Sequence, residues 1–190
     1  MSMDAALFRW INVNLGWDAI EPFMKAVSDF RLFVPFVLLA AAWMGFRDGR
    51  RGRVTLLALL LTVPLTDQVS SHLLKPWVGR PRPCRAEAGI EGVKTHGTRC
   101  SGRGSFPSSH AANSSAAAMA IASRYPVSWV PAVAMLILVG WSRVYLGVHY
   151  PGDVLGGWVL GGLLGWAGAW AAGRMGARSR GARRGSGPGG

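Results

Sequence analysis

The sequence contains few charged residues for its length. Only 16% of its 190 residues are charged, against about 25% in soluble domains, and acidic residues are the scarcest, nine against 21 Lys and Arg. In a soluble protein the formal net charge of +12 would indicate a nucleic-acid partner. Because half of the residues are hydrophobic, basic loops beside membrane spans, together with an anion-binding pocket, explain the charge better. We therefore expect a membrane protein without a nucleic-acid partner.

Two features of other protein classes are also missing. Residues 1–30 lack a basic start followed by an uninterrupted apolar core, so we expect no cleavable signal peptide. Outside the motifs described below, Asp, Glu and His do not cluster at metal-ligand spacing, and we expect neither a metal ion nor another cofactor. The nine Trp and 26 Gly are instead typical of membrane spans, where Trp anchors the interface and Gly allows close helix contact.

The apolar runs predict an all-α, polytopic membrane helix bundle of about five transmembrane helices. Charges interrupt the apolar residues of 1–30, which predicts an N-terminal interfacial amphipathic helix region or, alternatively, a short helix packed on the bundle. Residues 31–173 are predicted to form the membrane domain, and 174–190 a disordered basic cytoplasmic tail. The predicted spans lie at 32–46, 54–74, 108–123, 125–141 and 154–173.

Small residues predict which of these helices approach each other closely. Residues 108–123 are rich in Ala and Ser, a composition that allows close packing inside a membrane bundle. Gly157, Gly161 and Gly165 follow each other at four-residue spacing, which favours a helix–helix contact face. General glycine richness is the alternative explanation for that repeat.

The distribution of Lys and Arg sets the expected orientation. Four Arg in 47–53 and five in the tail predict that both segments are cytoplasmic in a cell (inner) membrane. Five crossings then place 75–107 and 142–153 together on the outer face, toward the periplasm or the exterior. The 75–107 loop itself carries seven Lys and Arg, which by count favours the inside. We attribute several of them to substrate binding.

Three short motifs carry the polar chemistry of these outer segments. Ser142-Arg143 is followed by His149 and Asp153 at the junction of two apolar runs, a pattern that packing does not explain. If this segment is helical, a His and an Asp four residues apart are separated by about one turn, and the carboxylate can hold the imidazole in one tautomer. The Arg can bind an anionic oxygen bidentately. The other two motifs are Lys75 with Arg82-Pro83, and Pro107-Ser108-Ser109-His110.

In order and spacing these motifs resemble the signature of the type 2 phosphatidic acid phosphatase (PAP2) family of membrane lipid phosphatases, K-x6-R-P, P-S-G-H and S-R-x5-H-x3-D. The resemblance covers roughly residues 60–165. Ser109 stands where the family usually has Gly, and a small residue there still allows close approach. In its small size the chain looks like bacterial members of the undecaprenyl-diphosphatase and lipid A phosphatase types.

The resemblance implies a metal-independent, two-step phosphoryl transfer. His149 would attack phosphorus and form a phosphohistidine, while Asp153 orients it. His110 would protonate the departing lipid oxygen and then activate the water that releases phosphate. Fixed cations and helix-terminal N–H groups would stabilise the phosphoryl oxygens. The residues expected to bind the phosphoryl group are Lys75, Arg82, Ser108, Ser109 and Arg143.

We therefore expect an enzyme that hydrolyses a lipid-linked phosphate or diphosphate on the outer face, with the lipid substrate and the bilayer as its partners. Analogy with small bacterial members favours undecaprenyl diphosphate. Phosphatidylglycerophosphate, phosphatidic acid and lipid A phosphates are alternative substrates, and the same site could transfer its phosphoryl group to another lipid or sugar. A membrane transporter or scaffold is a further alternative, but it would not need the two His and the Asp.

Several polar residues outside the motifs have two interpretations. Asp67 lies within a span and should face the bundle interior, where it either supports the site or makes an interhelical hydrogen bond. Arg80 is either a surface charge or an outer substrate ligand. His72 and His96 are expected to be structural. The remaining charges of the loop are expected to be solvated: Arg85, Lys94, Arg99 and Arg103.

The two cysteines both fall in the predicted outer loop. Cys84 and Cys100 are 16 residues apart. An oxidising exterior favours a disulfide between them. Two free thiols are the alternative.

Overall fold

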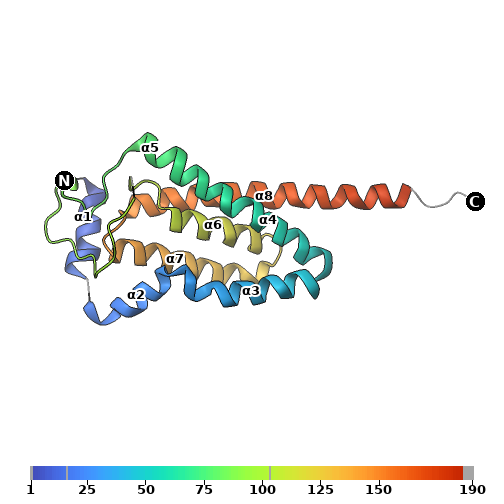
Figure 1. Ribbon diagram of the computed structural model, residues 1–190, viewed down its shortest axis with the longest axis horizontal. Coiled ribbons are helices and arrows are strands. Elements are labelled where there is room, and N and C mark those ends of the chain that lie inside the picture. The colour runs from blue at the N-terminus through green and yellow to red at the C-terminus, as the bar shows by residue number, and fades with distance from the viewer. Residues whose placement is uncertain (1, 16, 103, 186–190) are drawn as a thin grey trace, which may run out of the picture.

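The computed structural model describes residues 2–15, 17–102 and 104–185, with side chains up to residue 175. Within these ranges the chain consists of helices and loops, without a strand. The long helices run side by side as an elongated bundle, and a short N-terminal helix crosses one end (Figure 1). The α-helices are α1 Met3–Arg9, α2 Glu21–Ser28, α3 Phe30–Phe46, α4 Gly49–Gln68, α5 Lys75–Val78, α6 Ser109–Ala122, α7 Trp129–Tyr145 and α8 Pro151–Gly185. Short π and 3-10 segments lie at Trp10–Asn14, Asp18–Ile20, Val69–Leu74, Ala86–Ala88 and Pro126–Ser128.

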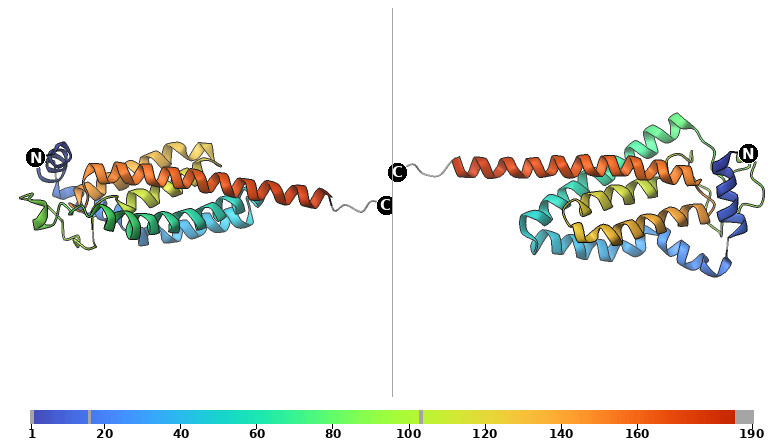
Figure 2. Two further views of the ribbon diagram at one scale, coloured as in Figure 1. Left: turned by 90° about the horizontal axis from the view of Figure 1, so that it is seen from above. Right: turned by 180° about the vertical axis from the view of Figure 1, so that it is seen from behind.

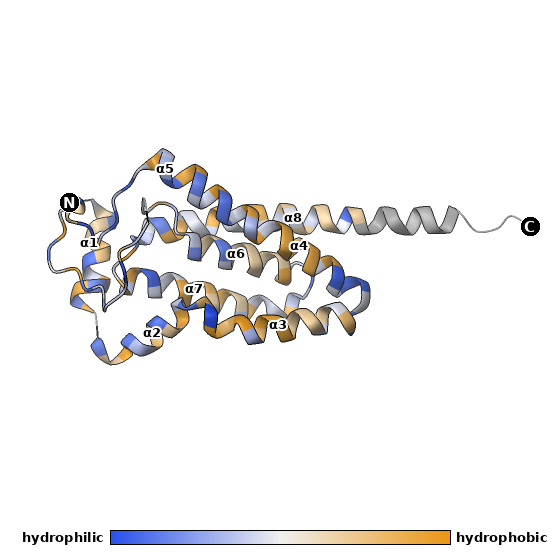
Figure 3. Cartoon of the chain, in the orientation of Figure 1, coloured by the Kyte–Doolittle hydropathy of each residue, from blue (hydrophilic) through white to orange (hydrophobic). Residues whose placement is uncertain are grey.

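Most of the long helices have the length and apolar character of membrane spans. In the described part of the chain, three segments qualify, Gly49–Val78, Pro126–Tyr145 and Pro151–Met175. A fourth span results if Asp18–Ser28 and Phe30–Phe46, which meet at 45°, are one bent unit. Figure 3 shows apolar residues along α3, α4 and α7, and many large apolar side chains are exposed there. The predicted all-α membrane bundle is confirmed.

The helix expected at 108–123 is shorter than the other predicted spans. It forms α6, whose 14 residues are too few to cross a bilayer alone. Half of its residues are buried, most of them Ala, and it packs against α4, α7 and α8. Because its neighbours shield it from lipid, it does not need the length of a lipid-exposed span. All five predicted helices are present in the described chain, as α3, α4, α6, α7 and α8. Three of its segments, or four with the bent pair, qualify as spans by length and composition alone.

Glycines of α8 bring that helix into close contact with α6. A Cβ atom at Gly157 would lie 2.6 Å from the carbonyl oxygen of Ser108. A Cβ at Gly161 would lie closer still to the carbonyl oxygen of Ala112, and one at Gly165 would lie 2.6 Å from a backbone oxygen of the next turn. The four-residue glycine repeat is thus a helix–helix contact face, as predicted. It fixes the beginning of α6 beside the beginning of α8.

The N-terminal segment packs onto the bundle. The two turned views show α1 lying across the end at which α8 begins (Figure 2). Phe8 is fully buried, with its ring 5.5 Å from that of Tyr150 in an edge-on arrangement. Leu7, Trp10 and Trp17 are exposed. The buried Phe8 matches the interpretation of residues 1–30 as a short helix packed on the bundle. The exposed apolar residues are compatible with an interfacial position, which stays a prediction.

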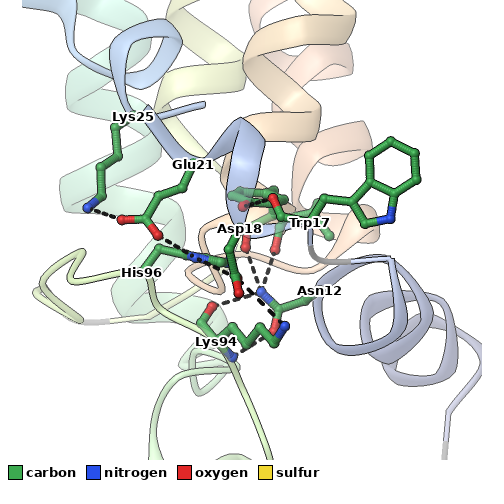
Figure 4. A network of polar contacts seen from close by, with 9 residues as sticks. Asn12, Trp17, Asp18, Glu21, Lys25, Lys94 and His96 are labelled. Atoms are coloured by element: carbon green, nitrogen blue, oxygen red, sulfur yellow. Dashed lines mark hydrogen bonds and ion pairs between the residues drawn. The ribbon is translucent and has the colours of Figure 1, made fainter. Parts of the chain in front are cut away.

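A polar network joins this N-terminal segment to the long loop before α6 (Figure 4). The Asn12 side-chain amide is buried and donates to the carbonyl oxygens of Tyr145 (2.6 Å) and Lys94 (2.8 Å), while its oxygen accepts from the Lys94 N–H (2.9 Å). His96 stacks on the Tyr145 ring at 4.4 Å, and its Nδ1 lies 3.1 Å from Glu21 Oε2. His96 therefore has the structural role that was predicted.

The same loop is closed covalently. Cys84 and Cys100 form a disulfide, which confirms the predicted pairing. Since Cys84 follows Arg82-Pro83 almost directly, the bridge restrains the loop beside that motif.

The last helix extends further than expected. α8 continues to Gly185, so residues 174–185 are helical where a disordered tail was predicted. This segment contains five Arg, which favour helix, and no Pro to end it. Residues 186–190 of the predicted tail lie outside the described residues.

The α6–α8 contact gives a stability prediction with an internal control. Gly161→Ala should lower the free energy of unfolding by about 1–3 kcal/mol, because the added methyl group meets backbone that cannot move away easily. The neighbouring Gly162→Ala should be well tolerated, since its Cβ would lie 3.6 Å from the Ser115 hydroxyl. Thermal unfolding of both variants in detergent checks this, and equal midpoints would contradict the proposed contact.

Candidate active site

The three sequence motifs lie together at the end of the bundle that α1 covers. Lys75 opens α5, Ser109 opens α6, and His149 lies between α7 and α8. The Lys75 ammonium donates a hydrogen bond to the Ser109 hydroxyl at 2.5 Å. Arg143 and His149 are close enough for their charges to act on His110. Segments that are far apart in the sequence therefore form one site.

A buried carboxylate holds the first histidine. His149 is 2% exposed and Asp153 is fully buried, and Nδ1 of the ring lies 3.4 Å from Oδ2 of the carboxylate. The same Oδ2 accepts hydrogen bonds from the Tyr150 N–H (2.9 Å) and the Ser105 hydroxyl, while Oδ1 accepts from Arg80 (2.8 Å). With Nδ1 directed to Asp153, Nε2 is the nitrogen left for a substrate.

The surroundings of His149 favour its neutral form. Burial lowers the pKa of His149 to about 4 from an ordinary value of 6.5. The contact with the Asp153 carboxylate acts in the opposite direction, and the positive charges of Arg143 and Arg82 lower the pKa further. At neutral pH the imidazole therefore keeps the lone pair that nucleophilic attack requires.

Three cations of the motifs are buried beside this ring. Lys75, Arg82 and Arg143 are each only 8% exposed. Among the described residues, none of the three forms an ion pair with a carboxylate. The Nε atoms of both arginines are buried without a hydrogen-bond partner in that part of the chain. Buried charge without a counter-charge is costly, so this arrangement suits an anionic ligand.

Ser109, where the family usually has Gly, contributes through its hydroxyl group. Besides accepting from Lys75, the Ser109 oxygen accepts from the Ser70 hydroxyl (3.0 Å) and lies 3.1 Å from that of Ser71. The hydroxyl thereby fixes the end of the Lys75 side chain. The substitution adds a contact that Gly could not make.

Ser108 is held in the helix cap. Its hydroxyl accepts from the Ala111 N–H at 3.5 Å at the N-terminus of α6, and its own N–H donates to the Asp153 carbonyl oxygen at 2.9 Å. The residue is fully buried. Ser108 thus ties α6 to α8, and its predicted contact with substrate stays a prediction.

The second histidine has a different environment. His110 lies in the first turn of α6 and is exposed, in contrast to the buried His149. In the described part of the chain its ring makes no hydrogen bond. The ring is thus accessible to substrate and water, as a proton-transferring group must be.

A cavity of about 390 Å³ opens beside these groups. Its charged lining is mostly basic, with Glu87 as its acidic residue. It has room for a polar group attached to the phosphoryl centre. The basic residues that line it are Lys75, Arg80, Arg82 and Arg85.

Arg80 forms ion pairs with two carboxylates, which neither interpretation of the sequence predicted. It was expected to be a surface charge or an outer substrate ligand, but its guanidinium forms ion pairs with Asp153 (2.8 Å) and Asp4 (2.6 Å). Asp4 and Ser105 are the residues around Asp153 that sequence reasoning missed. Ser105 adjoins the second motif, whereas no spacing in the sequence connects Asp4 with the site.

Two further residues outside the motifs are placed by the structure. Asp67 accepts a hydrogen bond from the Asn113 amide at 3.0 Å, which joins α4 to α6. This is the interhelical bond that was one of its two interpretations. His72 is exposed.

Comparison with known proteins identifies the family. The sequence model described as the PAP2 superfamily matches residues 53–175. The chain belongs to the PAP2 superfamily. All three motifs lie within the matched part of the chain.

Relatives and solved structures agree with this membership. A lipid A 4'-phosphatase of Bacteroides thetaiotaomicron is 38% identical over 57% of this chain, and the chain spans 50% of that protein's length. An undecaprenyl-diphosphatase of Sulfolobus acidocaldarius is 40% identical over 85% of this chain and 74% of its own length. The crystal structure of a transmembrane PAP2 type phosphatidylglycerolphosphate phosphatase from Bacillus subtilis superimposes with a TM-score of 0.67 at 25% identity, covering 90% of this chain and 85% of that one.

For this PAP2 protein, the environment of His149 predicts an unusual titration. Because burial lowers its pKa to about 4, the ring should stay neutral at pH 6 and gain a proton only in more acidic solution. Nitrogen-15 NMR of histidine-labelled protein in detergent measures this directly, with His149→Gln to assign the signal. A ring that titrates near its ordinary pKa of 6.5 would contradict the prediction.

Proposed function

We propose that this PAP2 protein is a membrane lipid phosphatase that cleaves a lipid-linked phosphate or diphosphate through a phosphohistidine intermediate. The observation that carries the proposal is the convergence of three buried cations without carboxylate partners on a histidine held by a buried aspartate. Three fixed positive charges match the phosphoryl oxygens, whose charge grows in the transition state. A transporter or scaffold would have no use for a neutral, oriented imidazole at this point.

In the first step, Nε2 of His149 attacks phosphorus, and the bond between phosphorus and the lipid oxygen breaks. Desolvation within the site and the positive charge of Arg143 lower the pKa of His110 to about 3, so the negative charge of the substrate must first raise it. The protonated His110 then gives its proton to the departing oxygen, so that the lipid leaves as an alcohol or a monophosphate. Lys75, Arg82 and Arg143 hold the phosphoryl oxygens during the transfer. Asp153 stabilises the positive charge that the His149 ring carries while it is bonded to phosphorus.

In the second step, His110 accepts a proton from water, and the water oxygen attacks phosphorus. The bond between phosphorus and Nε2 of His149 breaks, and inorganic phosphate is released. The protein cations supply the charge stabilisation, which supports a reaction that does not require a metal ion. A lipid or sugar hydroxyl that entered in place of water would turn the reaction into a phosphotransfer.

Among candidate substrates we favour undecaprenyl diphosphate. The relative named undecaprenyl-diphosphatase aligns with more of this chain than the lipid A 4'-phosphatase does, 85% against 57%. The basic cavity beside Lys75 and Arg82 also suits a ligand with a second anionic group. Phosphatidylglycerophosphate, phosphatidic acid and lipid A phosphates remain alternatives that one panel of substrates can separate.

We place the protein in the cell membrane with its site on the outer face. The Arg-rich segment 47–53 comprises the turn between α3 and α4 and the first residues of α4, at the opposite end of the bundle from the site (Figure 1). Basic turns of this kind are typical of the cytoplasmic side. The disulfide beside Arg82 is at the site end, where an oxidising compartment favours it.

Phosphate release from the four lipid classes in detergent with a metal chelator tests the activity. Wild-type protein should turn over at least one of them, and His149→Ala should reduce the rate to background because no nucleophile remains. His110→Ala should lower the rate by about 10²–10⁴-fold, the usual contribution of a general acid–base. The exposed His72→Ala is the matched control and should be fully active. Undiminished turnover by His149→Ala would refute the mechanism.

Labelling of single cysteines in intact cells tests the orientation. Because the native cysteines are paired, Glu91→Cys and Ser179→Cys each provide one free thiol. An impermeant maleimide should label position 91 directly and position 179 only after the membrane is permeabilised. The reverse pattern would place the site on the cytoplasmic side.

A further inference from the structure

Arg80 lies between two carboxylates from opposite ends of the chain. One terminal nitrogen donates to Asp153 Oδ1 at 2.8 Å, and the other donates to Asp4 Oδ2 at 2.6 Å. The guanidinium also stacks over the Tyr150 ring, 3.9 Å from its centre. Burial lowers the pKa of Arg80, but the two carboxylates outweigh this effect and raise it. Arg80 is therefore a fixed cation whose charge is already compensated within the protein.

Asp4 supports the same region through its second oxygen. Its Oδ1 accepts a hydrogen bond from the Gly152 N–H at 2.8 Å, in the first turn of α8. That turn carries Asp153. One carboxylate of the N-terminal helix thus binds both the helix end that carries Asp153 and the arginine that binds Asp153. The buried Phe8 anchors the short α1 helix on the same surface.

The geometry of Asp153 depends on what holds its two oxygens. Oδ2 faces the His149 ring, and Oδ1 faces Arg80. A carboxylate that rotates about its own axis would lose the contact of Oδ2 with the ring nitrogen. The Tyr150 N–H and the Ser105 hydroxyl hold Oδ2 directly, and Arg80 adds the restraint on Oδ1 that opposes this rotation.

We propose that Asp4 and Arg80 are positioning residues of the His149–Asp153 pair, so that the N-terminal segment forms part of the active site. The proposal rests on the proposed function of His149. Arg80 acts through Asp153 and not by binding substrate, although it lines the basic cavity. A substrate ligand would have an uncompensated charge, whereas both terminal nitrogens of Arg80 are engaged with carboxylates.

Steady-state kinetics separate positioning from substrate binding. With the panel lipid that the wild type cleaves fastest, Asp4→Ala and Arg80→Gln should lower kcat by about 10- to 100-fold, the cost of a misplaced reacting group. KM should change less than threefold. Arg80→Lys should recover part of kcat because it restores a cation. Glu91→Gln, which removes an exposed negative charge from the same loop, is the control and should match wild type.

A second pair of variants distinguishes a specific loss of the Asp4 contact from a general loss of structure. A Cβ at Gly152 would lie 2.7 Å from Asp4 Oδ2, and its nearest neighbours are all atoms of Asp4. Gly152→Ala should therefore displace the Asp4 carboxylate and lower kcat about as much as Asp4→Ala. In the Asp4→Ala background the same substitution should cost less than a further twofold, because its neighbour is gone. Full additivity of the two losses would overturn the proposal.

The NMR signal of His149 provides a readout that does not need turnover. Asp4→Ala and Arg80→Gln should both shift the Nδ1 resonance of His149, while Glu91→Gln should not. Unchanged kcat and unchanged resonances in the two variants would overturn the proposal, as would a raised KM with unchanged kcat in Arg80→Gln. If the wild type cleaves none of the four lipids, the proposed function fails. The resonance shifts then still decide whether Asp4 and Arg80 position His149.

Discussion

The burial of positive charge without an equal burial of negative charge is the constraint on which the rest of this structure depends. Lys75, Arg82 and Arg143 are nearly inaccessible to water, and the carboxylate whose charge acts on two of them, Asp153, forms its ion pair with Arg80 instead. Such an arrangement is unfavourable in the protein alone. It is tolerated where an anionic ligand is to be bound, and it explains why the family motifs contain so many cations.

Close helix packing provides the rigid frame that this charge distribution requires. Glycines of α8 let the backbones of α6 and α8 approach each other, and the Ser108 N–H donates directly to the Asp153 carbonyl oxygen. The starts of these two helices carry His110 and Asp153. Since both starts are held by backbone contacts, the separation of His110 and Asp153 is set by the fold and not by flexible side chains.

Features that depend on short sequence patterns could be predicted from the sequence. The apolar runs predicted the helical membrane bundle, the glycine spacing predicted the α6–α8 face, and the positions of the cysteines predicted their bridge. The three motifs predicted which segments meet. The helix predicted at 108–123 forms α6, but which helices surround it was not predicted, because shielding by neighbours is a property of the assembled bundle.

The partners of Asp153 could be predicted only in part. Its contact with His149 was predicted from their four-residue spacing, although His149 lies just before α8 and outside the helix. The contact of Asp4 with Gly152, by contrast, joins residues 148 positions apart. No periodicity or motif encodes such a pairing. The ion pairs of Arg80 could not be predicted for the same reason, since a charge in a Pro-rich loop does not indicate which carboxylates it will contact. The Ser109 hydroxyl, which holds Lys75, depends likewise on the final placement of α5 beside α6.

The distance in sequence between Asp4 and the first turn of α8 also bears on biosynthesis. A ribosome that has produced only the first 150 residues has made Asp4, Arg80 and both histidines, but not the carboxylate that orients one of them. On the proposed mechanism, the nascent protein would therefore lack the carboxylate that orients His149 until its last helix begins. A partly inserted or truncated chain could retain phosphate-binding cations, yet it would lack the means to use them.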